Sequence, residues 1–269
     1  MYSGTTIGKY SGTVTGAHQR IDRIARKKLE TLIHDGPIFP SIKDILYFEG
    51  NNGPDSVKRK SPSIDEPWHY IDPDKEHDVT LIDMINDHIA NLARALADEN
   101  HERASFEAAW LAHAVVDGLT PAHHFPLADK IHELFGMPHD QRLTVREKNL
   151  IRGINRRDTF SKNWEYWGGK GIFSSHILFE WGIATSMVGR RYPSRITDNE
   201  LADVTLRGYE AVFRESFRDV VKMDSYTLFI RHGWTLKVSR LVHQQLMPLI
   251  IDTVSLAWYA AYQQAKALK

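Results

Sequence analysis

The amino-acid sequence predicts an all-α protein, a single bundle of several helices. Apolar residues recur at three- and four-residue spacing along most of the chain, which is the period of an amphipathic helix. No stretch alternates apolar and polar side chains as a strand does, and no repeat or low-complexity tract occurs. No linker rich in Gly, Ser or Pro divides comparable halves, so we expect one domain over residues 1–269.

The first half of the chain opens with residues 1–16, rich in Gly, Ser and Thr, which we expect to form an extended arm. A helix is predicted over 17–33, where apolar residues follow helical spacing. Residues 34–77 contain more than half of the eleven Pro residues and little periodicity, which predicts a long irregular segment. Two amphipathic helices are then expected, over 78–98 and 106–116.

The second half of the chain is also expected to be helical. Helices are predicted over 124–135, 173–188, 198–221 and 235–267. Residues 145–167, rich in Arg and ending in the aromatic cluster WEYWGGKG, predict a loop or a short helix. The last helix contains Pro248, which predicts a kink, because proline removes a backbone hydrogen bond.

Composition limits the classes of function. The chain has 34 basic and 34 acidic residues and a sequence pI near 7.3, so no global basic field favours nucleic acid or an anionic membrane. The absence of Cys excludes disulfides and thiolate ligands and leaves His, Asp and Glu to bind metals. The N-terminal residues show no signal peptide and no apolar run reaches about 18 residues. We therefore expect a cytoplasmic protein, or a secreted one if the sequence begins after a removed signal.

The stretch WLAHAVVDGLTPAHH, residues 110–124, concentrates metal-binding side chains. His113 and Asp117 are four residues apart, which places them on one face of a helix. The Gly-Leu-Thr-Pro that follows predicts the end of that helix and a turn, after which His123 approaches from a second direction. Two imidazoles and a carboxylate are ligands that suit a divalent cation such as Zn²⁺.

The spacing of His113 and Asp117 is weak evidence by itself. With 14 His and 34 acidic residues in 269, about two His residues should have an acid four positions later by chance. Three such pairs occur: His18 with Asp22, His113 with Asp117, and His176 with Glu180. The surrounding turn residues and the other available imidazoles give the central pair its weight.

Three further candidates each have an ordinary structural explanation. His18 lies on an apolar helix stripe, where a histidine is more often a core residue than a ligand. Asp55 follows a Gly-Pro turn and is equally well explained as a turn-forming residue. His69, between Trp68 and Tyr70, is equally well explained as an exposed loop histidine.

The ordered series of these candidates resembles the zinc-dependent phospholipase C family, whose all-α fold is shared with three-zinc single-strand nucleases. The motifs that carry the resemblance are HQRIDRIARKKL, GPD before a basic residue, WHYIDPD, HAVVDGLTPAH and HILFE. They occur in the family's order and cover roughly residues 17–181. WHYIDPD and HAVVDGLTPAH are the most specific of them.

The resemblance implies two zinc sites. The first would be formed by His69, His113 and Asp117. Asp55 would be a further ligand of that ion or the general base. The second would be formed by His123, His176 and Glu180. The neighbouring His124 matches no ligand of the family, and we expect it to support the site or to lie on the surface.

A third zinc site of the family uses a histidine that corresponds to His18, with Asp117 as a bridge. The family completes that site with the amine and carbonyl of an N-terminal Trp, and no Trp precedes His18 in this chain. We therefore expect the third site to be weak or empty, unless another group from residues 1–16 completes it.

The leading functional hypothesis is a zinc-dependent phosphodiester hydrolase of the phospholipase C type, acting on a phospholipid or a small-molecule phosphodiester. Closely spaced divalent ions bind phosphate oxygens and lower the pKa of water, and Asp55 would accept the proton of that water. The lipid preference also draws on apolar turns at 38–40 and 125–127, which ordinary core packing explains equally well.

There are two alternatives, of which the second belongs to another class of function. A single-strand nuclease would bind nucleic acid through a stacking platform, for which the candidates are Trp164, Tyr166 and Trp167 with Arg156 and Arg157. A metal-stabilised binding protein would keep the ligands without turnover. Neither an HExxH motif nor the paired Glu-x-x-His motifs of a di-metal bundle occur.

Overall fold

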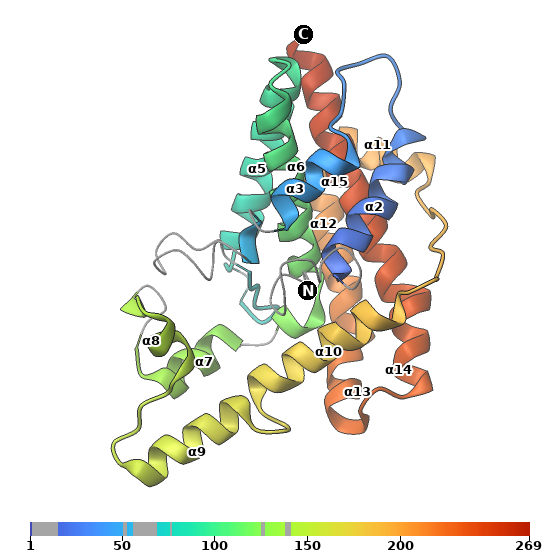
Figure 1. Ribbon diagram of the computed structural model, residues 1–269. Helices are drawn as coiled ribbons and strands as arrows, with labels where there is room; N and C mark the ends of the chain where they lie inside the picture. Colours follow the sequence, from blue (N-terminus) through green and yellow to red (C-terminus); the bar gives the residue numbers. More distant parts are fainter. Residues whose placement is uncertain (2–15, 51–52, 56–68, 76, 125–126, 138–140) are drawn as a thin grey trace.

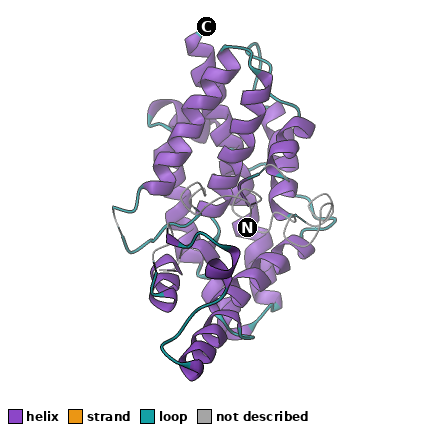
Figure 2. Ribbon diagram, turned by 60° about the vertical axis from the view of Figure 1, so that its left-hand side comes forward, coloured by secondary structure: helices purple, strands orange, loops and turns teal. Residues whose placement is uncertain are grey.

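The computed structural model of the protein describes residues 1, 16–50, 53–55, 69–75, 77–124, 127–137 and 141–269. All regular structure in these ranges is helical, and Figure 2 shows helices joined by loops with no strand among them. The predicted all-α class is therefore confirmed. The arm expected over residues 1–16 lies outside the described residues except at its two ends.

The core of the bundle is built around the C-terminal helix α15 (Met247–Leu268). Helices α2 (Ala17–Glu30), α5 (Thr80–Ala97) and α6 (His101–Gly118) pack against it (Figure 1). Trp258 of α15 is fully buried, and its indole Nε1 donates a 2.9 Å hydrogen bond to a backbone carbonyl of α6. A helix that is apolar on most of its faces can be surrounded in this way.

Helix α3 (Ile42–Glu49) corrects the prediction that residues 34–77 are irregular throughout. The hydroxyl of Ser41 accepts a hydrogen bond of 3.3 Å from the backbone N–H of Asp44, which caps the helix. Ile45 faces the core and is fully buried. Two turns are enough for one capped apolar face, and the surrounding prolines masked this short pattern.

An arm formed by three helices projects at the lower left of Figure 1. It contains α7 (Leu127–Phe135), α8 (Val145–Asn149) and α9 (Arg156–Trp167). We call these residues the α7–α9 arm. Its own small apolar cluster consists of Ile131, Leu134, Ile151 and Tyr166. Helix α10 (Ile172–Ser186) follows and packs against both α9 and α2, so it joins the arm to the bundle.

Two long predicted helices are interrupted in the C-terminal third. The expected helix over 198–221 divides into α11 (Asp198–Leu206) and α12 (Tyr209–Met223) at Gly208, whose φ of 83° favours glycine. The remaining elements are α13 (Ser225–His232), α14 (Leu236–Leu241) and a π-helical turn (Val242–Leu246). The π-helical turn lies directly before α15, whose second residue is Pro248.

None of the described helices has the length and apolarity that a membrane-spanning segment needs.

Candidate metal centre

Helix α6 presents two of the predicted ligands on one face near its C-terminal end. His113 and Asp117 are four residues apart and both are buried. Gly118 is the last residue of the helix, and a Cβ there would lie 2.7 Å from the ring of Phe213 and 2.9 Å from Leu81. The glycine therefore permits the close approach of α12 behind the two ligands.

A single helical turn, Pro121–His123, returns the chain toward α6. The Thr120 hydroxyl donates to the Val116 carbonyl at 2.6 Å, which fixes the start of the turn. Proline suits the first position of a helical turn, because the N–H that it lacks would have no partner there. His123 is thereby buried beside the ligands of α6.

The structure brings all eight predicted ligands into one cluster. Their ligand atoms form three groups, each with all atoms within 4.8 Å of one another: His18, His113 and Asp117; Asp55, His69 and His113; His123, His176 and Glu180. They come from α2, α6, the turn after α6, α10 and the segments around residues 55 and 69. Residues far apart in the sequence therefore meet near the middle of the molecule.

Asp117 lies at the centre of the first two groups. Its Oδ2 is 2.6 Å from His69 Nδ1 and 3.2 Å from His113 Nε2. Its Oδ1 is 3.3 Å from His18 Nε2. Two ligands about 2.1 Å from a tetrahedral zinc ion lie roughly 3.4 Å apart, so the spacings of 3.2 and 3.3 Å are close to those of metal ligands. The 2.6 Å contact with His69 is a hydrogen bond. His113 Nε2 is also 3.8 Å from Asp55 Oδ1.

The third group is equally compact. His176 and Glu180 are four residues apart on α10, and His176 Nε2 lies 2.8 Å from Glu180 Oε1. His123 Nε2 lies 2.8 Å from the same oxygen. Since His123 Nε2 is also 3.8 Å from Asp117 Oδ1, the three groups form one continuous site.

Two groups that the sequence analysis did not single out orient the histidines. Glu49, the last residue of α3, is buried, and its carboxylate accepts from His113 Nδ1 at 3.2 Å. The backbone carbonyl of His69 accepts from His123 Nδ1 at 2.6 Å. In both cases Nδ1 is engaged and Nε2 faces the cluster, which is how protein groups commonly orient metal-binding histidines. Glu49 was missed because α3 itself was not predicted.

The amino group of Met1 also lies in the cluster. It forms an ion pair with Asp117 and lies 3.3 Å from Glu180 Oε1 and 3.4 Å from His123 Nε2. Burial lowers the pKa of this amino group, but Asp117 and Glu180 outweigh burial and raise it to about 10. A positive charge therefore stands between the two acids, at a position suited to a cation.

Some polar atoms of the cluster form no hydrogen bond to a described residue. These atoms show whether the cluster suits a metal ion. Neither ring nitrogen of His18, which is fully buried, forms a hydrogen bond to any described residue, and neither does His113 Nε2. Such atoms are rare in buried positions and call for a partner. Nitrogens turned toward a shared carboxylate without a hydrogen bond suit a divalent cation, so the residues fit a metal centre.

Charges in the cluster support the same conclusion. Although burial raises the pKa of Asp117, its neighbours His123, the Met1 amine and His113 hold that pKa well below its ordinary value. Burial likewise opposes ionisation of Glu180, while His176 and the Met1 amine lower its pKa well below the usual range. Both carboxylates are therefore charged at neutral pH, as metal ligands must be.

Asp55 differs from the other members because its side chain is 28% exposed. Burial raises its pKa, but His113 and His69 outweigh burial and lower it to about 2. The carboxylate is consequently ionised and accessible at the edge of the cluster.

Other predicted positions lie elsewhere. His124 is buried, donates from Nε2 to the Gly118 carbonyl at 2.6 Å and packs on Phe217, so it supports the fold beside the cluster. In the proposed nuclease platform, Tyr166 is buried whereas Trp164 and Trp167 are exposed. Of the apolar turn at 38–40, only Ile38 is exposed, and residues 125–126 lie outside the described residues.

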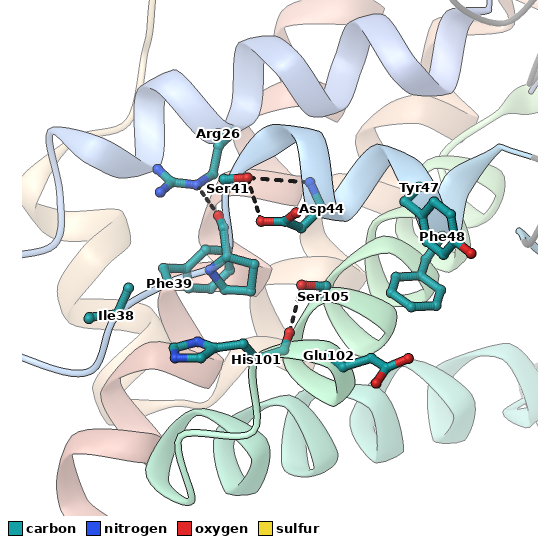
Figure 3. Close-up of a pocket in the computed structure, with 11 residues that line it drawn as sticks. Arg26, Ile38, Phe39, Ser41, Asp44, Tyr47, Phe48, His101, Glu102 and Ser105 are labelled. Carbon is teal, nitrogen blue, oxygen red and sulfur yellow. Dashed lines mark hydrogen bonds between the residues drawn. The ribbon is translucent and has the colours of Figure 1, made fainter.

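A cavity of about 540 Å³ opens elsewhere, between α2, the segment 38–41, α3 and the start of α6 (Figure 3). None of the eight ligands lines it. Three of its polar side chains already have partners in the protein: Ser41 caps α3, Arg26 Nε donates to the Pro40 carbonyl at 2.8 Å and Ser105 donates to the His101 carbonyl at 2.7 Å. The chemistry of the molecule is therefore concentrated in the cluster rather than in this cavity.

Comparison of the chain with protein-family models, with curated proteins and with solved structures finds no match.

Proposed function

We propose that the protein is a metal-dependent phosphodiester hydrolase of the phospholipase C type, with the eight-residue cluster as its active site. One observation carries the proposal: imidazoles and carboxylates from six segments converge, and their ligand atoms form three groups whose members lie within 4.8 Å of one another. The sequence resemblance implies the same ligands, with Zn²⁺ as the metal. Divalent ions held there would neutralise phosphate oxygens and lower the pKa of water.

The residues of the chain divide into ligands and orienting groups. Seven side chains would hold the ions: His18, His69, His113, Asp117, His123, His176 and Glu180. Glu49 and the His69 carbonyl fix two of the imidazoles, so that Nε2 is available and the ring position is set before an ion binds. This arrangement favours a preformed centre over one that assembles around the metal.

Asp55 would act at the accessible edge of the centre. It is ionised and 28% exposed, so it can bind an ion or accept a hydrogen bond from a water that attacks phosphorus. A general base works best when its pKa is near the working pH, whereas this pKa is about 2. The low value favours a role as ligand and water-orienting group over that of a strong base.

The test combines elemental analysis of the purified protein with a substrate screen. We expect bound divalent metal and hydrolysis of a phosphodiester in a set containing phosphomonoesters, bis(4-nitrophenyl) phosphate, phospholipids and single-stranded DNA. Asp55→Asn and His123→Ala should lower the rate by about a hundredfold or more, because each removes a group that touches metal or water. His232→Ala, an exposed histidine on α13, is the matched control and should keep full activity.

Two results would replace the proposal. Cleavage of single-stranded DNA with phospholipids untouched would favour the nuclease, which the exposed Trp164 and Trp167 beside Arg156 and Arg157 would serve. Bound metal without hydrolysis of any substrate would favour the metal-stabilised binding protein.

A further inference from the structure

Helix α9 exposes an unusual combination of side chains on one face. Arg157, Phe160 and Trp164 follow one another at three- and four-residue spacing and therefore share that face. Phe160 is 69% exposed and Trp164 65% exposed, and their rings stack with centroids 6.2 Å apart and planes 18° apart. A contiguous patch of large exposed aromatic side chains is typical of an interaction surface.

The opposite face of α9 is firmly attached to the arm. Asn163 donates from Nδ2 to the Ile151 carbonyl at 2.7 Å, and Tyr166 is buried in the small apolar cluster of the arm. Trp167 donates from Nε1 to the Asn149 carbonyl at 2.8 Å. The exposed aromatic pair is thus carried on a helix whose orientation is fixed.

Aliphatic side chains extend the exposed apolar surface of the arm. Ile154, directly before α9, is 93% exposed, and Leu143 is 59% exposed. Aliphatic side chains gain from burial in hydrocarbon but do not stack on nucleic-acid bases. Their presence beside Phe160 and Trp164 favours a lipid surface over a single strand.

The charge of residues 142–170, which contain α8 and α9 but not α7, complements an anionic surface. Residues 142–170 contain eight basic and three acidic residues, a net charge of +5, in a chain whose total charge is zero. The rest of the chain therefore carries −5. Arg156 and Arg157 form no ion pair with any described residue. Basic residues around exposed aromatic and aliphatic side chains are the composition of helices that lie in a membrane interface.

We propose that the exposed face of α9, with Ile154 ahead of it, docks the protein on an anionic phospholipid surface. Phe160 and Trp164 would enter the headgroup region, while Arg156 and Arg157 would contact lipid phosphates. The opposite face of α9 connects the helix to the candidate metal centre, because Tyr166 stacks on Phe173 of α10, whose ring lies 6.5 Å from that of His176. That the docked surface also supplies the substrate rests on the proposed function.

The experiment measures cosedimentation of the full chain with vesicles. Equimolar phosphatidylcholine and phosphatidylglycerol is compared with phosphatidylcholine alone, at low and at physiological salt. We expect binding to the anionic vesicles that weakens with salt, because contacts between exposed charges are screened. Phe160→Ala with Trp164→Ala should weaken binding about tenfold or more, and Arg156→Gln with Arg157→Gln should remove the preference for anionic lipid.

Matched controls carry the same changes at exposed positions away from the arm. Tyr47→Ala with Leu206→Ala removes two large apolar side chains that are 64% and 82% exposed. Lys27→Gln with Lys43→Gln removes two exposed basic charges. Both control variants should bind vesicles as the unaltered chain does. Circular dichroism of each variant verifies that the helices are retained.

The outcomes separate this proposal from the proposed function. Vesicle binding that is unchanged in the Phe160/Trp164 variant, or absent in the unaltered chain at low salt, overturns the docking surface. Binding of a fluorescent single-stranded oligonucleotide through the same residues, without vesicle binding, overturns it in favour of nucleic acid. Hydrolysis of soluble bis(4-nitrophenyl) phosphate should be equal in the unaltered chain and the Phe160/Trp164 variant. If neither protein hydrolysed bis(4-nitrophenyl) phosphate while the unaltered chain still bound vesicles, the proposed hydrolase function would be refuted and the docking surface would stand.

Discussion

Two buried polar networks in this molecule differ in whether the protein completes them. Lys28 and Asp252 form one, which we call the Lys28–Asp252 clamp: Lys28 Nζ lies 2.8 Å from Asp252 Oδ1 and also donates to the Pro193 carbonyl at 3.3 Å. The backbone N–H of Arg195 donates to Asp252 Oδ2 at 3.1 Å. In the cluster of eight candidate ligands, by contrast, His18 is fully buried and forms no hydrogen bond to a described residue.

The difference indicates what each network needs. The clamp joins α2 to α15 and holds the segment after α10, and opposite charges there meet directly. The cluster gathers ligand atoms from eight side chains around shared carboxylates and leaves imidazole nitrogens facing inward. Buried polar groups cost free energy unless they are paired, so the first network is complete, whereas the second contains imidazole nitrogens that could bind a metal ion.

Metal removal is expected to have the largest effect and to act on the cluster alone. An ion that binds only the folded protein stabilises it by about 2.7 kcal/mol when its free concentration is about a hundred times Kd, and two sites double this. Chelation of a metal-loaded sample should therefore lower Tm by on the order of ten degrees. Calorimetry of the loaded and the chelated protein measures the shift.

Variants sharpen that comparison. His176→Ala should show a smaller shift on chelation, because one group has lost a ligand. Asp252→Asn should show the same shift as the unaltered chain, since neither Lys28 nor Asp252 belongs to the ligand groups. An unchanged Tm after chelation of a sample with verified metal content would contradict the distinction between the networks.

Breaking the clamp is expected to have the next largest effect. Asp252→Asn leaves the buried Lys28 ammonium without its charged partner, and removal of one partner of a buried ion pair costs about 3–5 kcal/mol. Urea unfolding should show this loss with and without metal. The double change Lys28→Met with Asp252→Leu should cost less than the single change, because it leaves no unpaired charge. A double variant less stable than the single variant would show that the Lys28–Asp252 pair adds to the free energy of unfolding beyond neutralising its own two buried charges.

A smaller effect is expected from pH at His243, in the π-helical turn. Its Nδ1 accepts from the Tyr192 hydroxyl at 2.6 Å, and its Nε2 lies 2.9 Å from Ser186 Oγ. Burial, aided by Arg190, lowers the pKa of His243 to about 4 from the ordinary 6.5. The unfolded chain therefore binds more protons between these values, and this contribution to stability is lost as pH falls from about 6.5 toward 4.

The free energy of unfolding, measured by urea titration from pH 7 to pH 4.5, tests this. His243→Gln removes the titrating group, so its stability should fall less steeply over the same interval. Equal slopes for the two proteins would show that the Tyr192–His243–Ser186 chain tolerates a charged imidazole.

The contrast between the networks also shows what sequence can predict. The sequence predicted the helical class and the residues of the cluster, because ligand chemistry is carried by short motifs such as HAVVDGLTPAH. Convergence of the loop residues Asp55 and His69 on α6 could be expected only from the resemblance, since spacing along a chain says nothing about how loops fold back. The clamp was not predicted, because nothing in its local sequence links Lys28 to a residue more than two hundred positions away.

Some elements escaped prediction for local physical reasons. Helix α3 is short and lies among prolines, so its cap and single buried face were outweighed by the composition of residues 34–77. Glu49, at the end of α3, was lost with it. Residues 145–167 were predicted as a loop or a short helix, and α9 is the helix among them. The choice stayed open because exposed aromatic residues give α9 little of the apolar periodicity that marks a buried helix face.

The smallest expected effect concerns the two histidines that stack in the cluster, His18 and His113, with ring centroids 4.0 Å apart. His113 belongs to two of the three ligand groups, whereas His18 belongs to one. Loss of a ligand or of its support typically lowers affinity or activity by about ten- to a hundredfold. His18→Ala should therefore reduce hydrolysis about tenfold and His113→Ala about a hundredfold, and metal titration should reveal two tight ions and a looser third.

Three ions of equal affinity, with His18→Ala as damaging as His113→Ala, would contradict this ranking. That result would mean that a further group completes the third site. The Met1 amine is the group in position, because it pairs with Asp117 and lies 3.3 Å from Glu180. A ligand amine must give up its proton, so binding of the third ion would then release a proton and tighten with rising pH. A chain extended by one residue before Met1 should lose the third ion while keeping the first two, which would identify the amine as its ligand.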